Sequence, residues 1–184
     1  MTSFPVFLMR HGAPVERGVL LGSTDCDVTH EGIHACAAQA RDLSPAVLIS
    51  SDLVRARRCA EACGKPHIDP RWRELDFGEW DGLAPATIDL TALDGFWSDP
   101  DRHPPPSGER WSDLMARVGA AIDALSPAPT LVVTHGGAMR AALAHLCGLS
   151  ALAAWAFDLP YASLLTLNVW DGTPRRAQIV GLRP

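Results

Sequence analysis

Lysine is almost absent from this sequence of 184 residues: Lys65 is the only one, although lysine and arginine together number 16. No run of basic residues could follow a nucleic-acid backbone, and the formal net charge is −5, so we exclude nucleic acid as a partner. Positive charge at any functional site must come mainly from guanidinium groups, which suit bidentate recognition of phosphate.

Paired cysteines are also missing. The five cysteines are odd in number and form no CxxC motif, whereas a zinc site would need tighter clustering. Most of them stand among alanine and leucine, where cysteine acts as a small core residue. We therefore expect reduced thiols, a cytoplasmic protein and no bound metal.

Long apolar runs are absent as well. No stretch reaches the length needed to span a membrane, and the short apolar run at 4–9 has no basic region before it. We expect neither a signal peptide nor a membrane partner. With 47% hydrophobic and 20% charged residues, the composition is that of a globular protein, and the length predicts a single domain over 1–184.

Short apolar runs predict the strands. Three continuous runs at 4–9, 46–49 and 130–133 are typical of buried strands in a mainly parallel sheet. Two further strands are expected at 163–170 and 175–180, joined by a short turn.

Helical periodicity lies between these runs. Apolar residues recur at helical spacing over 33–40, 56–63, 111–125 and 139–146. Thr29 is the expected N-cap of the first helix, Ser51 or Asp52 that of the second, and Gly148 ends the last. The alternation predicts an α/β doubly wound fold, with helices on both faces of the sheet.

The segment 71–108 differs in composition, being rich in proline, tryptophan, aspartate and glycine. We expect it to leave the sheet, to contain a short helix and to cover a site. Its Trp80 and Trp97 either line a substrate pocket or pack in the core, and packing is the commoner role of tryptophan.

Candidate functional residues gather where strands end, which is where open α/β sheets bind ligands. His11 and His135 each follow a predicted strand and precede a glycine, and Arg55 lies in the first turn of a helix. Gly136 opens another helix, whose free N–H groups suit an anion. Together with Arg10, these residues favour binding of a phosphate dianion.

Phosphoryl transfer requires an in-line nucleophile, charge stabilisation and an acid for the leaving oxygen. A neutral imidazole at His11 can be the nucleophile. Glu74 has the best sequence context for the acid, with Asp76, Glu79 and Asp81 as substitutes. A single histidine after a strand is more often structural, but the paired placement favours function.

Several motifs resemble those of one known family. LMRHG at 8–12 resembles the signature of the histidine phosphatase superfamily, also called phosphoglycerate mutase-like. Four further motifs follow in the family's order: GSTD at 22–25 with THEG at 29–32, SSDLVRA at 50–56, ELDFGEWDG at 74–82 and VTHGG at 133–137.

The resemblance implies specific roles. His11 would be the phosphorylated nucleophile, Glu74 the proton donor, and His135 a catalytic residue that also binds the phosphate. The other implied phosphate ligands are Arg10, Arg55 and the backbone N–H of Gly136. No metal and no cofactor would be needed.

Substrate-binding residues are implied less directly. Ser23 and Thr24 match the family's substrate loop, and Arg17 stands where mutases commonly have a phosphate-binding asparagine. Ala13 replaces a glutamate of many members, and Pro14 stiffens the loop. These departures affect specificity more than phosphoryl chemistry.

The motifs at 77–82 and 106–109 look most like those of α-ribazole phosphatases and related small-molecule phosphatases. Authentic mutases are usually longer, so we expect hydrolysis of a small-molecule phosphate ester, with α-ribazole phosphate as a candidate. The alternatives are a mutase-type phosphoryl transferase, a catalytically idle phosphate-binding domain and, from another class, a metallohydrolase.

Overall fold

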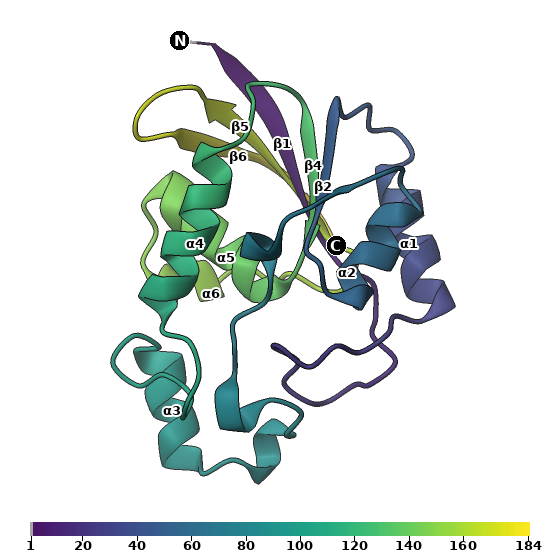
Figure 1. Cartoon of the computed structure of the whole chain (residues 1–184). Helices are drawn as coiled ribbons and strands as arrows, with labels where there is room; N and C mark the ends of the chain where they lie inside the picture. The colour runs from purple at the N-terminus through teal and green to yellow at the C-terminus, as the bar shows by residue number, and fades with distance from the viewer. Residues whose placement is uncertain (1) are drawn as a thin grey trace.

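A six-stranded sheet forms the centre of the computed structural model, which describes residues 2–184 (Figure 1). Its strands are β1 (Ser3–Arg10), β2 (Val47–Ser50), β3 (His67–Ile68), β4 (Thr130–Thr134), β5 (Leu164–Trp170) and β6 (Arg176–Arg183). They lie in the order β3-β2-β4-β1-β5-β6. The first four in that order are parallel, whereas β5 and β6 are antiparallel to their neighbours.

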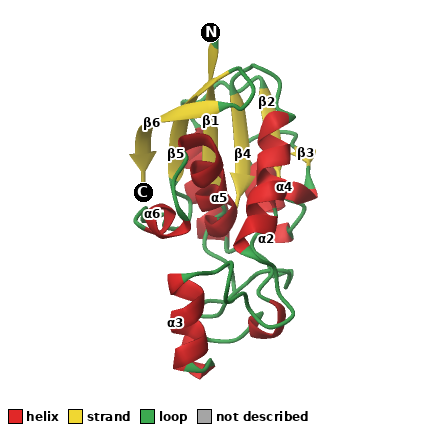
Figure 2. Cartoon of the chain, turned by 90° about the vertical axis from the view of Figure 1, so that its left-hand side faces the viewer, coloured by secondary structure: helices red, strands yellow, loops and turns green. Residues whose placement is uncertain are grey.

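Helices cover both faces of this sheet, as the sequence predicted (Figures 1 and 2). The α-helices are α1 (His30–Ala40), α2 (Val54–Glu61), α3 (Leu90–Ser98), α4 (Trp111–Asp123), α5 (Gly136–Cys147) and α6 (Ala151–Trp155). Short 3-10 turns are η1 (Pro70–Trp72), η2 (Gly78–Trp80) and η3 (Pro85–Thr87). Helices α1 and α2 lie on one side of the sheet, and α4 and α5 lie on the other.

Strand residues divide between two cores because successive side chains point to opposite faces. On β1, Leu8 packs in the core beneath α4 and α5, while its neighbour Met9 packs beneath α1 and α2. On β4, Val132 belongs to the first core and Val133 to the second. Burial on both faces explains why these strands read as continuous apolar runs.

Two of the three predicted caps are confirmed. The Thr29 hydroxyl accepts a hydrogen bond from the Gly32 N–H at 3.0 Å, and Gly148 ends α5 with φ of 68°. The predicted cap of α2 is wrong, since Leu53 occupies that position without a side-chain hydrogen bond. Ser51 instead lies beside a histidine ring, and Asp52 forms an ion pair with Arg73.

Strand β3 and helix α6 were not predicted, nor were the 3-10 turns η1, η2 and η3. Strand β3 consists of two exposed residues at the sheet edge, and α6 has five residues. Both are too short to show the periodic spacing of apolar residues that predicts a strand or a helix.

The segment 71–108 extends beyond the carboxyl ends of the parallel strands and carries η2, η3 and α3 (Figures 1 and 2). Phe96 of α3 anchors it: its ring lies 6.2 Å from that of Phe77, 5.8 Å from Trp80 and 6.5 Å from Trp155 of α6. This aromatic cluster holds α3 against the main body.

Within residues 2–184, none of the helices combines the length and the apolar character that crossing a membrane requires.

Candidate active site

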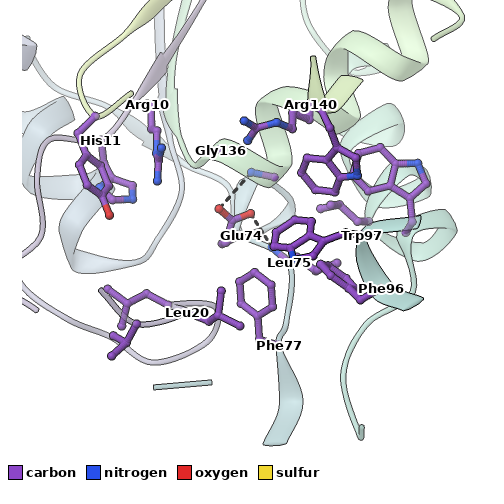
Figure 3. Close-up of a pocket in the computed structure, with 17 residues that line it drawn as sticks. Arg10, His11, Leu20, Glu74, Leu75, Phe77, Phe96, Trp97, Gly136 and Arg140 are labelled. Atoms are coloured by element: carbon purple, nitrogen blue, oxygen red, sulfur yellow. Dashed lines mark hydrogen bonds between the residues drawn. The ribbon is translucent and has the colours of Figure 1, made fainter. Parts of the chain in front are cut away.

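A cavity opens at the carboxyl ends of β1 and β4 (Figure 3). Arg10 and His11 line it from the end of β1, and Gly136 and Gly137 from the start of α5. The segment 71–108 contributes Glu74, Leu75, Phe77, Phe96 and Trp97. Residues far apart in the sequence therefore meet at the sheet edge where ligand binding was predicted.

The loop that carries His11 is held tightly. The His11 backbone N–H donates to the carbonyl of Thr134 at 2.8 Å, and the Gly12 N–H lies 3.3 Å from the sulfur of Cys59. A Cβ on Gly12 would overlap the backbone of Gly32 in α1, so only glycine fits here. The backbone thus fixes where the imidazole stands.

The His11 ring is buried, and its Nδ1 lies 2.7 Å from the carbonyl oxygen of Gly12. A carbonyl can only accept, so Nδ1 carries the proton and Nε2 keeps a free lone pair. Burial lowers the pKa of His11 well below its usual value, and the charges of Arg55 and Arg10 lower it further. The ring is therefore neutral at pH 7, as a nucleophile must be.

His135 lies directly beside this ring, with centroids 5.0 Å apart and an edge-on arrangement. Its Nε2 is 3.0 Å from the hydroxyl of Ser51, while its Nδ1 is buried without a partner among residues 2–184. Burial first, and then Arg55 and His11, lower the pKa of His135. If the hydroxyl donates to Nε2, Nδ1 carries a proton that no described residue accepts, in a ring that is fully buried and does not itself line the cavity.

Two contacts hold the guanidinium of Arg10 in place. Its Nη1 donates to the Leu159 carbonyl at 2.6 Å, and its guanidinium lies 4.2 Å from the ring centre of Tyr161. Sequence reasoning missed Tyr161, which also lies 5.5 Å from the His11 ring. It reaches the site because β5 runs antiparallel to β1, so the residues before β5 meet the end of β1. No local pattern signals that pairing.

Arg55 is fully buried behind the cavity instead of lining it. Its guanidinium donates to the carbonyls of Leu21, Gly22 and Thr24 at 2.8–2.9 Å. Asp81 holds the same loop by accepting from the N–H groups of Gly22 and Thr24. Arg55 thus positions the loop, and its charge acts on both buried histidines.

The candidate substrate-binding side chains lie elsewhere. Arg17, Ser23 and Thr24 are exposed, and none of them lines the cavity that contains His11. Val19, Leu20 and Leu21 of the same loop face the cavity in their place.

The carboxylate of Glu74, from the segment 71–108, contacts the start of α5 on the wall of the cavity. Its Oε2 accepts from the Gly137 N–H at 3.1 Å and its Oε1 from the Leu75 N–H at 2.9 Å. A Cβ on Gly137 would overlap Oε1, so the close approach requires glycine.

The other acids considered for the same role do not reach the cavity. Asp76 accepts from the Gly78 N–H, Glu79 accepts from the exposed Ser107 hydroxyl, and Asp81 holds the loop described above. Among these acids, Glu74 alone lines the cavity with His11.

Comparison with known proteins assigns the chain to a family. The model of the family described as "Histidine phosphatase superfamily (branch 1)" matches residues 6–180 of this chain. The chain belongs to this superfamily. It is 32% identical to the probable phosphoglycerate mutase GpmB of Erwinia tasmaniensis, across 79% of this chain and 76% of that protein.

Solved structures of similar proteins support the same fold. A crystal structure of a protein from Thermus thermophilus shares 33% identity with a TM-score of 0.77, covering 95% of this chain and 96% of the other. A mycobacterial glucosyl-3-phosphoglycerate phosphatase shares 26% identity with a TM-score of 0.85, covering 97% and 98%.

In this member of the histidine phosphatase superfamily, Arg117 of α4 holds the segment of chain that carries Glu74. It donates to the carbonyls of Arg71, Arg73 and Glu74 at 2.7–2.8 Å. It also forms two hydrogen bonds to the carboxylate of Glu109, at 2.7 and 2.8 Å. No sequence pattern indicated this role, because the contact joins α4 to a distant irregular segment.

The remaining wall of the cavity is apolar and aromatic. It consists of Val19, Leu20, Leu21, Leu75, Phe77, Phe96, Trp97, Trp111, Leu114 and Trp155. Of the two tryptophans singled out in the sequence, Trp80 is buried in the core, whereas Trp97 is 40% exposed and lines the cavity.

Metal ligands are not grouped within residues 2–184: no three histidine, cysteine, aspartate or glutamate side chains are placed to hold an ion. All five cysteines are free thiols.

Proposed function

We propose that this member of the superfamily hydrolyses small phosphate monoesters through a phosphohistidine intermediate, without a metal. The observation that carries the proposal is the state of His11. Its Nδ1 is occupied by the Gly12 carbonyl, and burial keeps the ring neutral, so Nε2 offers a lone pair beside the cationic Arg10.

In the first step, His11 Nε2 attacks phosphorus in line and the ester P–O bond breaks. Glu74 gives a proton to the leaving oxygen, so the alcohol departs neutral. The charge of the transferred group is stabilised by Arg10 and by the N–H of Gly136, which line the cavity, and by the buried Arg55 and the unpaired Nδ1–H of His135.

In the second step, water attacks the phosphohistidine and the P–N bond breaks. The Glu74 carboxylate now accepts a proton from that water, and inorganic phosphate leaves. Both His11 and Glu74 thereby return to their starting states, so the cycle needs no further reactant.

Metal-free chemistry is supported by the side chains present. Burial, and then the positive charges of Arg55 and Arg10, lower the pKa of both histidine rings, and the same charges would repel a cation. The arginines already supply the positive charge that a metal supplies in other phosphatases.

Hydrolysis is favoured over transfer by the match to a mycobacterial glucosyl-3-phosphoglycerate phosphatase along nearly the full length of both chains. The second candidate is a phosphoglycerate mutase activity, which the 32% identity to a probable mutase supports. We propose a cytoplasmic setting because all five thiols are free, which suits a reducing compartment.

The test is phosphate release in EDTA from p-nitrophenyl phosphate, α-ribazole phosphate, 3-phosphoglycerate and glucosyl-3-phosphoglycerate. We expect the wild type to turn over at least one ester and His11→Ala to turn over none. His30→Ala, which removes an exposed histidine, should retain wild-type rates. Conversion of 3-phosphoglycerate to 2-phosphoglycerate without phosphate release would favour the mutase, and activity restored by zinc after EDTA would refute the metal-free mechanism.

A further inference from the structure

A second guanidinium, that of Arg140, lines the active-site cavity together with that of Arg10 and has no part in the proposed reaction. Arg140 follows Gly136 by one helical turn of α5, so it projects from the same face of the helix. In Figure 3, Arg140 lies above Glu74, and Arg10 lies between Arg140 and His11.

Protein contacts hold this side chain in place without using all of its donors. Its Nη2 donates to the Phe157 carbonyl at 3.0 Å, and the guanidinium lies 5.0 Å from the ring centre of Trp155. Its Nε is buried and has no partner among residues 2–184. The group is therefore oriented by α6 and the chain that follows it.

The Nη1 atom of Arg140 faces the same space as Arg10. A Cβ added to Gly136 would lie 3.1 Å from Arg140 Nη1 and 3.5 Å from Arg10 Nε. Glycine at this position leaves that space open, so two guanidinium groups border one small volume at the start of α5.

The charges around the cavity are unbalanced. Arg10 and Arg140 are its lining cations, and Glu74 is its lining acid. In the proposed reaction the phosphoryl group pairs with Arg10, and Glu74 enters with a proton for the leaving oxygen. The remaining acid that acts on Arg140 is the exposed Asp158, which forms no ion pair with it, so the cavity-facing side of this partly buried guanidinium is left for an anion of the substrate.

We propose that Arg140 binds a second anionic group, a carboxylate or a phosphate, on the leaving alcohol of the substrate. Glu74 marks the position of the leaving oxygen, so Arg140 reaches the part of the substrate just beyond the scissile bond. The preferred substrates are then phosphorylated hydroxy acids or bisphosphates, rather than esters of neutral alcohols. This inference rests on the proposed phosphatase activity.

The experiment compares substrates that differ only in the second group. 3-Phosphoglycerate is paired with glycerol 1-phosphate, which replaces its carboxylate by a hydroxymethyl group. Fructose 1,6-bisphosphate is paired with fructose 1-phosphate. The wild type, Arg140→Met and Arg140→Lys are measured on all four, with p-nitrophenyl phosphate as the reference for the chemical step. Arg41→Met is the matched control, since Arg41 is exposed at the end of α1.

We expect the wild type to prefer the anionic member of at least one pair. Arg140→Met should lower kcat/KM for that member roughly 10- to 100-fold, the range of a charge-assisted hydrogen bond. Its rate on p-nitrophenyl phosphate and on the neutral partner should change by less than about threefold, and Arg140→Lys should restore part of the preference. The pair that responds identifies carboxylate or phosphate as the ligand.

Two results would overturn the inference. One is a wild type that shows no preference within either pair while it hydrolyses p-nitrophenyl phosphate through His11, which would leave the phosphatase proposal intact. The other is an equal loss on all substrates in Arg140→Met, accompanied by a lower melting temperature, which would assign Arg140 a structural role only. Absence of His11-dependent hydrolysis from every ester would instead refute the proposed function itself.

Discussion

The replacement Gly137→Ala separates the position of Glu74 from the stability of the fold. Gly137 lies in the first turn of α5, where its N–H donates to Glu74 Oε2 at 3.1 Å, and an added Cβ would overlap Oε1. Alanine is a better helix former than glycine by about 1 kcal/mol, so the helix itself gains from the change. The carboxylate, however, must move away.

Gly137→Ala should therefore lower catalytic activity without lowering the stability of the fold. Displacement of a catalytic group by about 1 Å costs on the order of 100-fold in rate. We therefore expect kcat/KM for alkyl phosphates to fall roughly 100-fold, while the free energy of unfolding in urea stays within about 1 kcal/mol of the wild type. Aryl esters, whose leaving groups need less protonation, should lose much less.

The background Glu74→Gln provides the control for this experiment. If Gly137→Ala acts through the carboxylate, adding it to Glu74→Gln should change the rate little, because the two effects share one cause. The reasoning is refuted if Gly137→Ala leaves alkyl ester hydrolysis intact, or if it slows aryl and alkyl esters equally in both backgrounds.

Three further predictions concern the acid, its support and the histidines. Glu74→Gln should slow the phosphorylation of His11 mainly with alkyl esters, and equal loss on aryl esters in rapid-quench kinetics would place the acid elsewhere. Arg117→Met leaves the partly buried Glu109 carboxylate without its ion-pair partner, so the free energy of unfolding in urea should fall by about 3–5 kcal/mol. An unchanged denaturation midpoint would contradict the role of Arg117 in holding the chain that carries Glu74. The pKa of His135 is lowered in the folded state, so below about pH 6.5 the unfolded chain binds more protons than the folded chain. As the pH is lowered through this range, the free energy of unfolding should decrease by up to about 1.4 kcal/mol per pH unit for this residue. His135→Gln should reduce that slope, measured by denaturation at pH 5 to 6.5, and an identical slope would refute the assignment.

The central strands and the residues at their ends were predictable from sequence because local rules govern both. β1 and β4 are buried on both faces, so their apolar runs are continuous, and the polar residues that follow must lie at one sheet edge. Strand β3 at the edge and the five-residue α6 lack any such pattern.

Residues that reach the site through tertiary packing were not predictable in the same way. Tyr161 arrives through an antiparallel pairing, and Arg117 through contact with irregular chain. Arg140 did carry a local signal, since it follows Gly136 by four residues and so shares its helix face. The predicted cap at Ser51 was wrong because its hydroxyl lies beside His135 instead.

The central claim is that His11 carries the phosphoryl group during turnover. The most direct measurement mixes the wild type with its best ester, quenches in alkali to preserve phosphohistidine, and maps the modified residue by mass spectrometry. We predict phosphate on His11 in the wild type and none in His11→Ala. Efficient turnover with no phosphoenzyme, or with phosphate on His135 or another residue, would contradict the account.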